Sequence, residues 1–242
     1  MPESLFILIV AGSFLASFIN AAFALGGAFL MLALITSILP ISAVIPLHSP
    51  FMFGSLLGRC WLFRQHLVWR IIIPFLCGCV FGVLAGSMLY INFPDWFIAL
   101  VISGLMLSVW LPGLNFRAKF SKLFFIVGII HSFLSTVFAY GGILHSLVLR
   151  TGLNKEQVTA TIAGSLLAMG VLKIAGYTFY GFDYRPYLET ILACIPASFL
   201  GTWLGKRFSH HISETMFRLI FKIIMTGFGL RLLYLSFQLY ID

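Results

Sequence analysis

The hydrophobic pattern of this chain consists of eight apolar segments joined by short polar links. They cover approximately residues 4–39, 41–58, 70–92, 94–112, 121–149, 157–181, 186–205 and 213–237. Six of them have the length of an ordinary transmembrane helix, about 20 residues. The first and fifth are longer, and each is interrupted by a pair of glycines. One long broken segment followed by three spans therefore occurs twice, which predicts two homologous halves, 1–113 and 114–242.

The two glycine pairs lie at corresponding places in these halves. They are Gly26-Gly27 and Gly141-Gly142. From Gly26 to Ser49 the chain advances 23 residues, and from Gly141 to Ser165 it advances 24. Glycines four residues apart also recur in the third and seventh segments, in a pattern that lets helices approach closely. These are Gly82 and Gly86, and Gly201 and Gly205. The matching spacings support the internal repeat.

Composition narrows the class of protein. The chain is 61% hydrophobic and only 9% charged, and its mean hydropathy is +1.06. A soluble domain with this balance could not cover its surface with polar groups. We therefore expect an all-α polytopic membrane protein. The net charge of +8 does not predict a nucleic-acid partner, because the basic residues flank the membrane segments, where lipid headgroups and topology account for them.

The placement of the loop cations decides between two topologies. If all eight segments crossed the membrane, the cations would divide seven to four between its faces. If each broken segment instead enters and returns on the same side, ten of them share one face and only Arg185 lies opposite. The ten are Arg59, Arg64, Arg70, Arg117, Lys119, Lys122, Arg150, Lys155, Lys206 and Arg207. The positive-inside rule favours this second arrangement.

The second arrangement gives each half one re-entrant element and three transmembrane helices. Because an odd number of crossings reverses the direction of the second half, it predicts an inverted repeat. Residues 4–24 are also long enough to span the membrane alone. This leaves open a first element made of a span followed by a short return.

The glycine pairs predict where a substrate binds. Non-helical backbone at membrane depth is tolerated only where it is buried in protein or lines a polar cavity. A break frees backbone N–H groups and exposes a helix N-terminus, and both suit an anion. One break alone would indicate close packing or a kink, but two at matching positions point to a midplane binding site formed by both.

Polar side chains near the breaks complete this candidate site. Hydroxyl and amide groups recur at matching distances from the two pairs, although each alone could bond a helix carbonyl instead. Lys173 lies well inside the sixth segment, where it would add positive potential or snorkel to an interface. His48 and His131 could carry protons or bond within the bundle. The predicted binding set is Asn20, Gly26, Gly27, His48, Ser49, Ser135, Tyr140, Gly141, Gly142, Ser165 and Lys173.

No sequence pattern predicts catalysis. The chain has no His-Glu-x-x-His motif, no paired aspartates within an apolar segment and no serine-nucleophile motif. Ser49 directly follows His48, and neighbours on a helix do not face each other. We therefore expect no enzyme activity, no cofactor and no metal site. The expected partners are a small anion and the lipid bilayer. A coupling proton or other ion and a homodimer are left open, and a lipid-handling or scaffolding role is an alternative.

The motifs resemble those of a known family. Asn20-Ala-Ala-Phe-Ala-Leu before the first glycine pair, Pro40 after it, and the repetition as Tyr140-Gly141-Gly142 with Thr161-Ile-Ala-Gly164-Ser165 look like the TauE/SafE family of sulfite-exporter-type permeases. The resemblance covers essentially the whole chain. It implies a multi-pass protein of the inner (plasma) membrane that moves sulfite, an organosulfonate or a related sulfur oxyanion. We expect a transporter with alternating access, and the alternative is an anion channel or facilitator without it.

Overall fold

The computed structural model describes residues 2–23, 26–107, 121–139, 142–149, 151–208 and 214–241. Within these ranges the secondary structure is helical and no strand occurs, which confirms the all-α class. Six helical stretches are long and apolar enough to cross a membrane. They are Glu3–Ala22, Ile41–Leu62, Trp69–Tyr90, Glu156–Phe179, Arg185–Phe208 and Lys222–Ile241.

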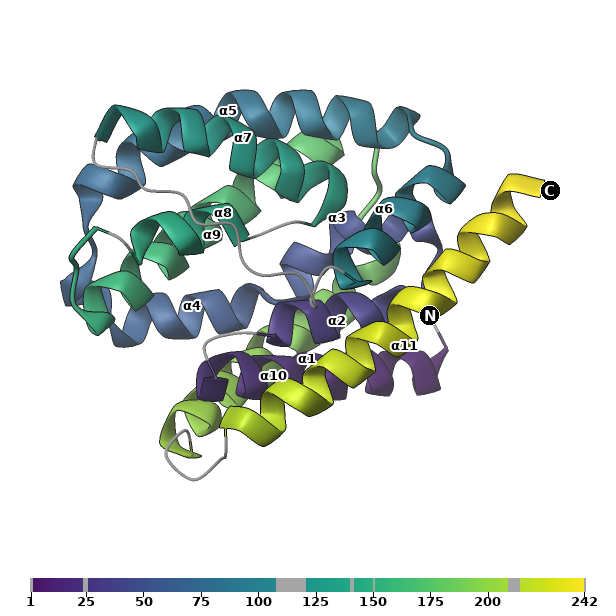
Figure 1. Cartoon of the computed structure of the whole chain (residues 1–242), viewed down its shortest axis with the longest axis horizontal. Coiled ribbons are helices and arrows are strands. Elements are labelled where there is room, and N and C mark those ends of the chain that lie inside the picture. Colours follow the sequence, from purple (N-terminus) through teal and green to yellow (C-terminus); the bar gives the residue numbers. More distant parts are fainter. Residues whose placement is uncertain are drawn as a thin grey trace. The chain divides into compact units, whose positions relative to one another are not determined.

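The helices follow the predicted segments closely (Figure 1). They are α1 (Glu3–Phe23), α2 (Gly27–Ile35), α3 (Ile41–Phe51), α4 (Phe53–Leu62), α5 (Trp69–Asn92), α6 (Asp95–Leu107), α7 (Ser121–Phe138), α8 (Gly142–Val148), α9 (Lys155–Phe179), α10 (Leu188–Phe208) and α11 (Glu214–Ile241), with the 3-10 turns η1 (Arg64–His66) and η3 (Arg185–Tyr187). Both predicted breaks occur, one between α1 and α2 and the other between α7 and α8. The predicted span 94–112 is helical as far as Leu107, and its remaining residues lie outside the described ranges.

The first broken segment folds back on itself. A Cβ atom at Gly12 would meet Leu34, near the end of α2, whereas one at Gly27 would lie 1.9 Å from the Ala16 carbonyl oxygen. The order of these contacts shows that α2 runs antiparallel to α1. Gly26 joins the two helices with φ 95°, a conformation that favours glycine because it has no Cβ. The arrangement is a helix of spanning length followed by a short return, the alternative that the sequence left open.

The described helices form two compact units. The first unit contains α1, α2, α3, α6, α10 and α11, and the second contains α5, α7, α8 and α9, while α4 continues from one into the other. These units do not coincide with the two sequence halves, because each unit takes helices from both. In the first unit α1 packs against α10, and in the second α7 packs against α5. Each broken segment therefore pairs with the third predicted segment of the other half.

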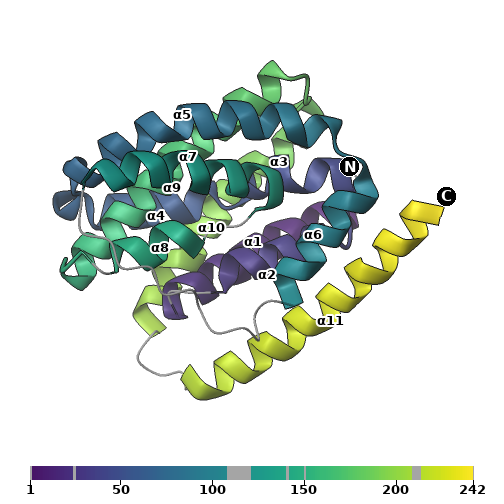
Figure 2. The same ribbon diagram turned by 45° about the horizontal axis from the view of Figure 1, so that its top comes forward.

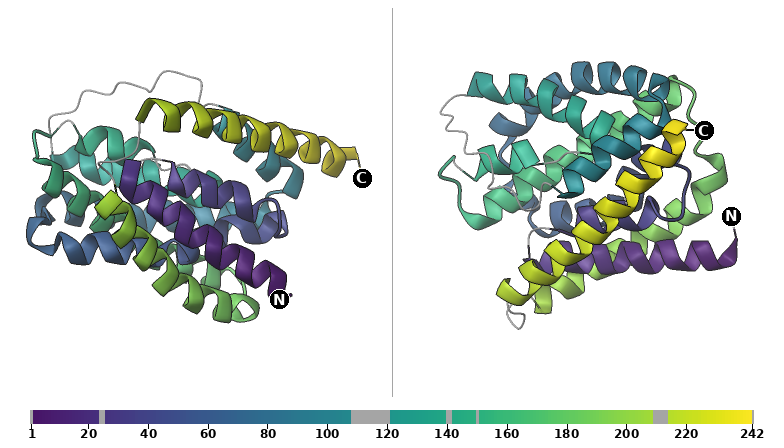
Figure 3. Two further views of the ribbon diagram at one scale, coloured as in Figure 1. Left: turned by 90° about the horizontal axis from the view of Figure 1, so that it is seen from below. Right: turned by 45° about the vertical axis from the view of Figure 1, so that its right-hand side comes forward.

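A close glycine contact holds each of these helix pairs together. In the second unit, a Cβ atom at Gly82 of α5 would lie 2.2 Å from the carbonyl oxygen of Ile129. In the first unit, a Cβ atom at Gly201 of α10 would lie 2.2 Å from that of Phe14. Gly205 meets Phe18 one turn further along, so α10 and α1 run parallel. The α1–α10 pair is seen as neighbouring purple and yellow-green helices in Figure 3. The small residues found in the sequence thus act as sites of close helix approach.

In the first unit, α11 packs along α6 (Figure 2). The hydroxyl of Ser236 donates to the carbonyl of Trp96 at 2.8 Å, and the ring of Trp96 packs edge-on against Tyr240 at 5.2 Å between centroids. These contacts join the last helix of each sequence half.

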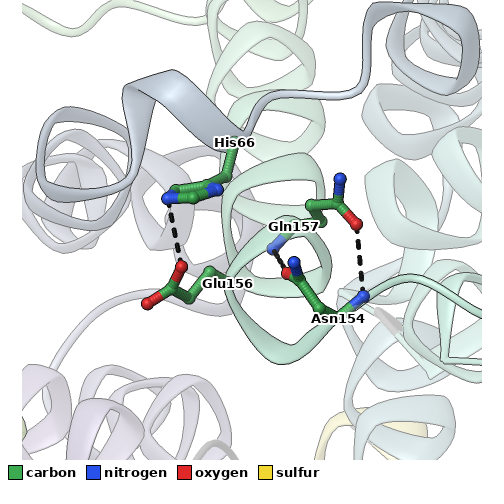
Figure 4. A network of polar contacts seen from close by, with 4 residues as sticks. All are labelled: His66, Asn154, Glu156 and Gln157. Atoms are coloured by element: carbon green, nitrogen blue, oxygen red, sulfur yellow. Dashed lines mark hydrogen bonds and ion pairs between the residues drawn. The ribbon is translucent and has the colours of Figure 1, made fainter.

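A capping box begins α9 in the second unit (Figure 4). The Asn154 side chain accepts from the backbone N–H of Gln157 at 2.8 Å, and the Gln157 side chain accepts from the N–H of Asn154 at 3.2 Å. These bonds satisfy donors that a helix start leaves unpaired. An exposed ion pair of 3.1 Å between His66 and Glu156 lies beside the cap and joins η1 to the first turn of α9.

The variant Asn154→Ala is expected to lower the free energy of unfolding by about 1 kcal/mol, because the start of α9 loses its cap. Thermal unfolding of the purified protein in detergent measures this loss. Glu156→Gln breaks only the exposed ion pair and is the matched control, with an expected change below about 1 kcal/mol. A larger loss in Glu156→Gln than in Asn154→Ala would contradict the assignment of the cap.

Candidate functional site

Four predicted site residues gather at the start of α2 in the first unit. Gly26 is the N-cap of α2, and as a glycine it has no side chain with which to cap the helix. Gly27 packs so closely on α1 that an added Cβ would lie 2.6 Å from Cβ of Asn20. The Nε2 atom of His48 lies 2.9 Å from the carbonyl oxygen of Ala28 and ties α3 to the first turn of α2. Asn20, the glycine pair and His48 therefore lie together at the start of α2. The predicted Ser49 follows His48 on α3 and is half-buried.

In the second unit, Lys173 reaches the end of α7. This side chain is only 1% exposed. Its Nζ atom donates to the carbonyl oxygen of Ser135 at 2.9 Å, and the hydroxyl of Tyr177, one turn further along α9, donates to the carbonyl of Thr136. The carbonyl of Ser135 also accepts the backbone N–H of Ala139 at 3.1 Å, and the C-terminus of a helix carries a partial negative charge. Lys173 and Tyr177 therefore cap α7 at the second break.

The second break has a left-handed residue of its own. Ala139 directly follows α7 and has φ 57°, which stops the helix, although this conformation is usually taken by glycine. Of the three predicted residues that follow, Tyr140 and Gly141 lie outside the described ranges, and Gly142 is the first residue of α8. Ser135 and Lys173, two residues of the predicted set, therefore lie in contact beside the second break.

No acidic side chain of the described chain pairs with Lys173. Each described acid lies in a loop or in the first turn of a helix. These are Glu3, Asp95, Glu156, Asp183, Glu189 and Glu214. An ammonium group has three N–H donors, and the described partner of this one is the Ser135 carbonyl. The positive charge of Lys173 is therefore buried with carbonyl and helix-end partners but with no carboxylate.

His131 lies on the same helix one turn before Ser135. It is fully buried, its ring packs 5.6 Å from that of Phe75 on α5, and its Nδ1 atom accepts the backbone N–H of Leu144 on α8 at 3.3 Å. Since Nδ1 accepts, we assign the proton of the neutral ring to Nε2. Nε2 is buried without a partner among the described residues. His145 of α8 and Lys173 of α9 are both close enough to act on this ring electrostatically.

The predicted binding set omits His131. The sequence did indicate a role for His131, because it is one of few ionisable residues within an apolar segment. Such residues are usually functional in membrane proteins. The hydrogen bond between His131 and Leu144 could not be predicted from the sequence, because the two residues meet only when α8 folds back along α7.

Other buried hydroxyl groups of the second unit also lack partners among the described residues. They are Ser87 Oγ, Thr136 Oγ1 and Ser165 Oγ. Thr136 follows Ser135 directly, whereas the predicted Ser165 lies eight residues before Lys173 on α9, about 12 Å along the helix axis. Unpaired buried polar groups are rare, and those found among the described residues all belong to the second unit. The described residues contain no cluster of potential metal ligands.

Removal of the Thr136 hydroxyl is expected to leave the substrate-free protein at least as stable as the original. Thr136→Val replaces an unpaired buried hydroxyl by a methyl group of the same shape, which is neutral or stabilising by up to about 1 kcal/mol. Thermal unfolding without added anion measures this. Thr178→Val is the matched control, since that exposed hydroxyl already donates to the carbonyl of Ile174 at 2.8 Å. A clear loss of stability in Thr136→Val would show that the hydroxyl is already paired.

Spanning-length helices, two interruptions and buried polar groups at the interrupted ends are the architecture of a helical membrane transport protein. The chain belongs to the sulfite exporter TauE/SafE family, whose family model matches residues 9–232. This confirms the family that the glycine motifs indicated. It makes the chain a multi-pass membrane protein and indicates a transporter for sulfur compounds, in a family of transporters rather than of enzymes. Comparison with curated proteins and with solved structures gives no match.

Proposed function

We propose that the protein is a secondary transporter that moves a small sulfur oxyanion, such as sulfite or an organosulfonate, across the plasma membrane. The observation that carries this proposal is the buried ammonium of Lys173, which has no carboxylate partner among the described residues. Family membership supplies the class of substrate.

The electrostatics of Lys173 favour an anionic ligand. A charge buried in protein costs several kcal/mol unless it is paired and hydrogen-bonded. The C-terminus of α7 offers a carbonyl acceptor and a partial negative charge of about half an elementary charge. This offsets the positive charge of the ammonium only in part. A bound anion would supply the remaining negative charge and accept the free N–H donors. A neutral or cationic substrate would not supply this negative charge.

Both broken elements contribute to the proposed transport cycle. The start of α2 offers the backbone donors next to Gly26 and Gly27, and the end of α7 offers Lys173 and its neighbours. Discontinuous helices supply substrate and ion contacts in other transporters with internal repeats. The duplicated glycine contacts of α1–α10 and α7–α5 support such a repeat. That it is inverted, that both elements share a midplane site and that access alternates are parts of this proposal.

Reconstituted protein tests the proposal directly. Proteoliposomes loaded with unlabelled sulfite or methanesulfonate are expected to accumulate the labelled anion from outside by exchange, with saturation. Protein-free liposomes and labelled lactate, a carboxylate of similar size, are the controls. Absence of exchange for every sulfur oxyanion would contradict the proposal. Single-channel currents without exchange would assign the protein to the alternative class of anion channels.

A further inference from the structure

We propose that the site beside Lys173 accepts oxyanions that carry one negative charge, hydrogensulfite or a sulfonate, and rejects dianions such as sulfate and thiosulfate. The inference rests on the proposed function and adds the charge of the substrate to it. Two structural features carry it. They are the single ammonium of Lys173 and the neutral, correctly oriented imidazole of His131.

The structure fixes His131 as the neutral partner of this pair. Its Nδ1 atom already accepts the N–H of Leu144 at 3.3 Å. A second ring proton would place one N–H group against another in a fully buried position, so α8 would have to leave α7 for this histidine to become charged. In the described arrangement His131 therefore presents an uncharged Nε2–H donor. It contributes a hydrogen bond to the ligand but no charge.

The groups packed around the pair leave the charge of the site at one. The titratable neighbours of His131 and Lys173 are His145 on α8, Tyr177 on α9, and Cys79 and Tyr90 on α5. Tyrosine and cysteine are ordinarily neutral near pH 7, and histidine is mostly so. The described carboxylates all lie in loops or at helix starts. The fixed charge that faces a ligand here is therefore that of Lys173.

A single buried charge discriminates between anions by valence. A monoanion forms a neutral pair with the Lys173 ammonium, whereas a dianion leaves one negative charge unpaired in a medium of low dielectric constant. The available donors suit an oxyanion: two N–H groups of Lys173 and Nε2–H of His131. They are directional donors from α7 and α9, and they match the several oxygens of a sulfite or sulfonate group.

Ligand titration of the intact purified protein in detergent tests this inference. Methanesulfonate is a monoanion throughout the mild pH range, sulfate is a dianion, and sulfite changes from hydrogensulfite to the dianion near neutral pH. We expect methanesulfonate to bind and sulfate to bind at least about a hundredfold more weakly. The affinity for total sulfite, divided by that for methanesulfonate, is expected to fall about tenfold for each pH unit above the loss of the hydrogensulfite proton. A change in the protonation of the protein affects both affinities, so it cancels in this ratio.

Two variants locate the effect. Lys173→Met is expected to lose methanesulfonate binding, whereas Lys206→Met removes an exposed cation from the end of α10 and is expected to bind as before. Binding of methanesulfonate by a folded Lys173→Met protein would overturn the inference. So would sulfate binding within about threefold of methanesulfonate, or a sulfite-to-methanesulfonate ratio that is constant with pH. These last two need only the unaltered protein and would leave the proposed function standing. Failure of all three anions to bind would overturn both proposals.

Discussion

Lys173→Met is expected to abolish the transport of sulfur oxyanions. Removal of one member of a buried charge pair typically costs about 3–5 kcal/mol, which corresponds to a loss of more than about a hundredfold in affinity. Methionine retains the length of the lysine stem, so the change is mainly one of charge and hydrogen bonding. Exchange of labelled anion in proteoliposomes measures the loss. Lys206→Met, the exposed α10 cation, is the control and should transport normally.

The capping role of Lys173 has to be separated from its role in binding. The methionine variant also loses the 2.9 Å bond from Lys173 to the carbonyl of Ser135, although that carbonyl still accepts the backbone N–H of Ala139 at 3.1 Å. The loss of one hydrogen bond from a charged donor costs about 1.5–3 kcal/mol of stability. A ligand that binds the folded protein raises its unfolding temperature. We therefore expect the substrate to stabilise the original protein and to have no such effect on Lys173→Met, even where the variant starts from a lower temperature. Transport at the original rate would refute a binding role for this lysine.

Hydropathy and glycine placement were sufficient to predict the helices and both breaks. A helix that crosses the lipid bilayer requires about 20 consecutive apolar residues, so the spans are recognisable as apolar stretches of that length. Gly26 was recognisable because the turn into α2 needs φ 95°, a requirement that only a residue without Cβ meets easily. Five of the six predicted spans of ordinary length agree with helices long enough to cross a membrane.

The partners of the small residues could not be predicted. The repeated Gly-x-x-x-Gly pattern shows that a helix approaches closely there, but it does not say which helix arrives. In the structure, Gly82 packs against α7 and Gly201 packs against α1. Each compact unit therefore contains helices from both halves of the sequence. Such pairing depends on contacts far apart in the chain. The two-half division of the sequence remains a prediction about its internal repeat, separate from the way in which its helices pack.

The candidate site was predicted best where its residues are local. Asn20 meets Gly27 because α2 returns directly along α1. Ser165 and Lys173 share α9, yet eight residues turn the helix by about 80° beyond two full turns and separate them along its axis, so the hydroxyl of Ser165 does not join the ammonium. The Nε2 donor of His131 becomes evident only from the Leu144 bond. Sequence spacing thus identified the polar residues but not which of their atoms remain unpaired.

Gly128→Val is expected to prevent α5 and α7 from packing and to leave little folded protein. A Cβ atom at Gly128 would lie 2.2 Å from the carbonyl oxygen of Phe75 and 3.1 Å from Cα of Gly78, and a Cβ at Gly78 would in turn meet the carbonyl of Phe125 at 2.1 Å. The two atoms named at Gly128 belong to the backbone, so no side-chain rotation relieves the clash. Overpacking of a core typically costs about 1–3 kcal/mol, and separation of two whole helices should exceed this.

The consequence of Gly128→Val reaches the candidate site because α7 also carries His131, Ser135 and the carbonyls that Lys173 and Tyr177 cap. Displacement of α7 from α5 would move these groups together, so any protein that folds should also lose anion binding. The yield of monodisperse protein and its unfolding temperature measure the first effect. Gly227→Val on α11 is the matched control, since nothing lies within 4 Å of its added Cβ, and we expect its stability to change by less than about 1 kcal/mol. Equal yields and unfolding temperatures for the two variants would refute the close α5–α7 contact, and with it the packing that holds the end of α7 against Lys173.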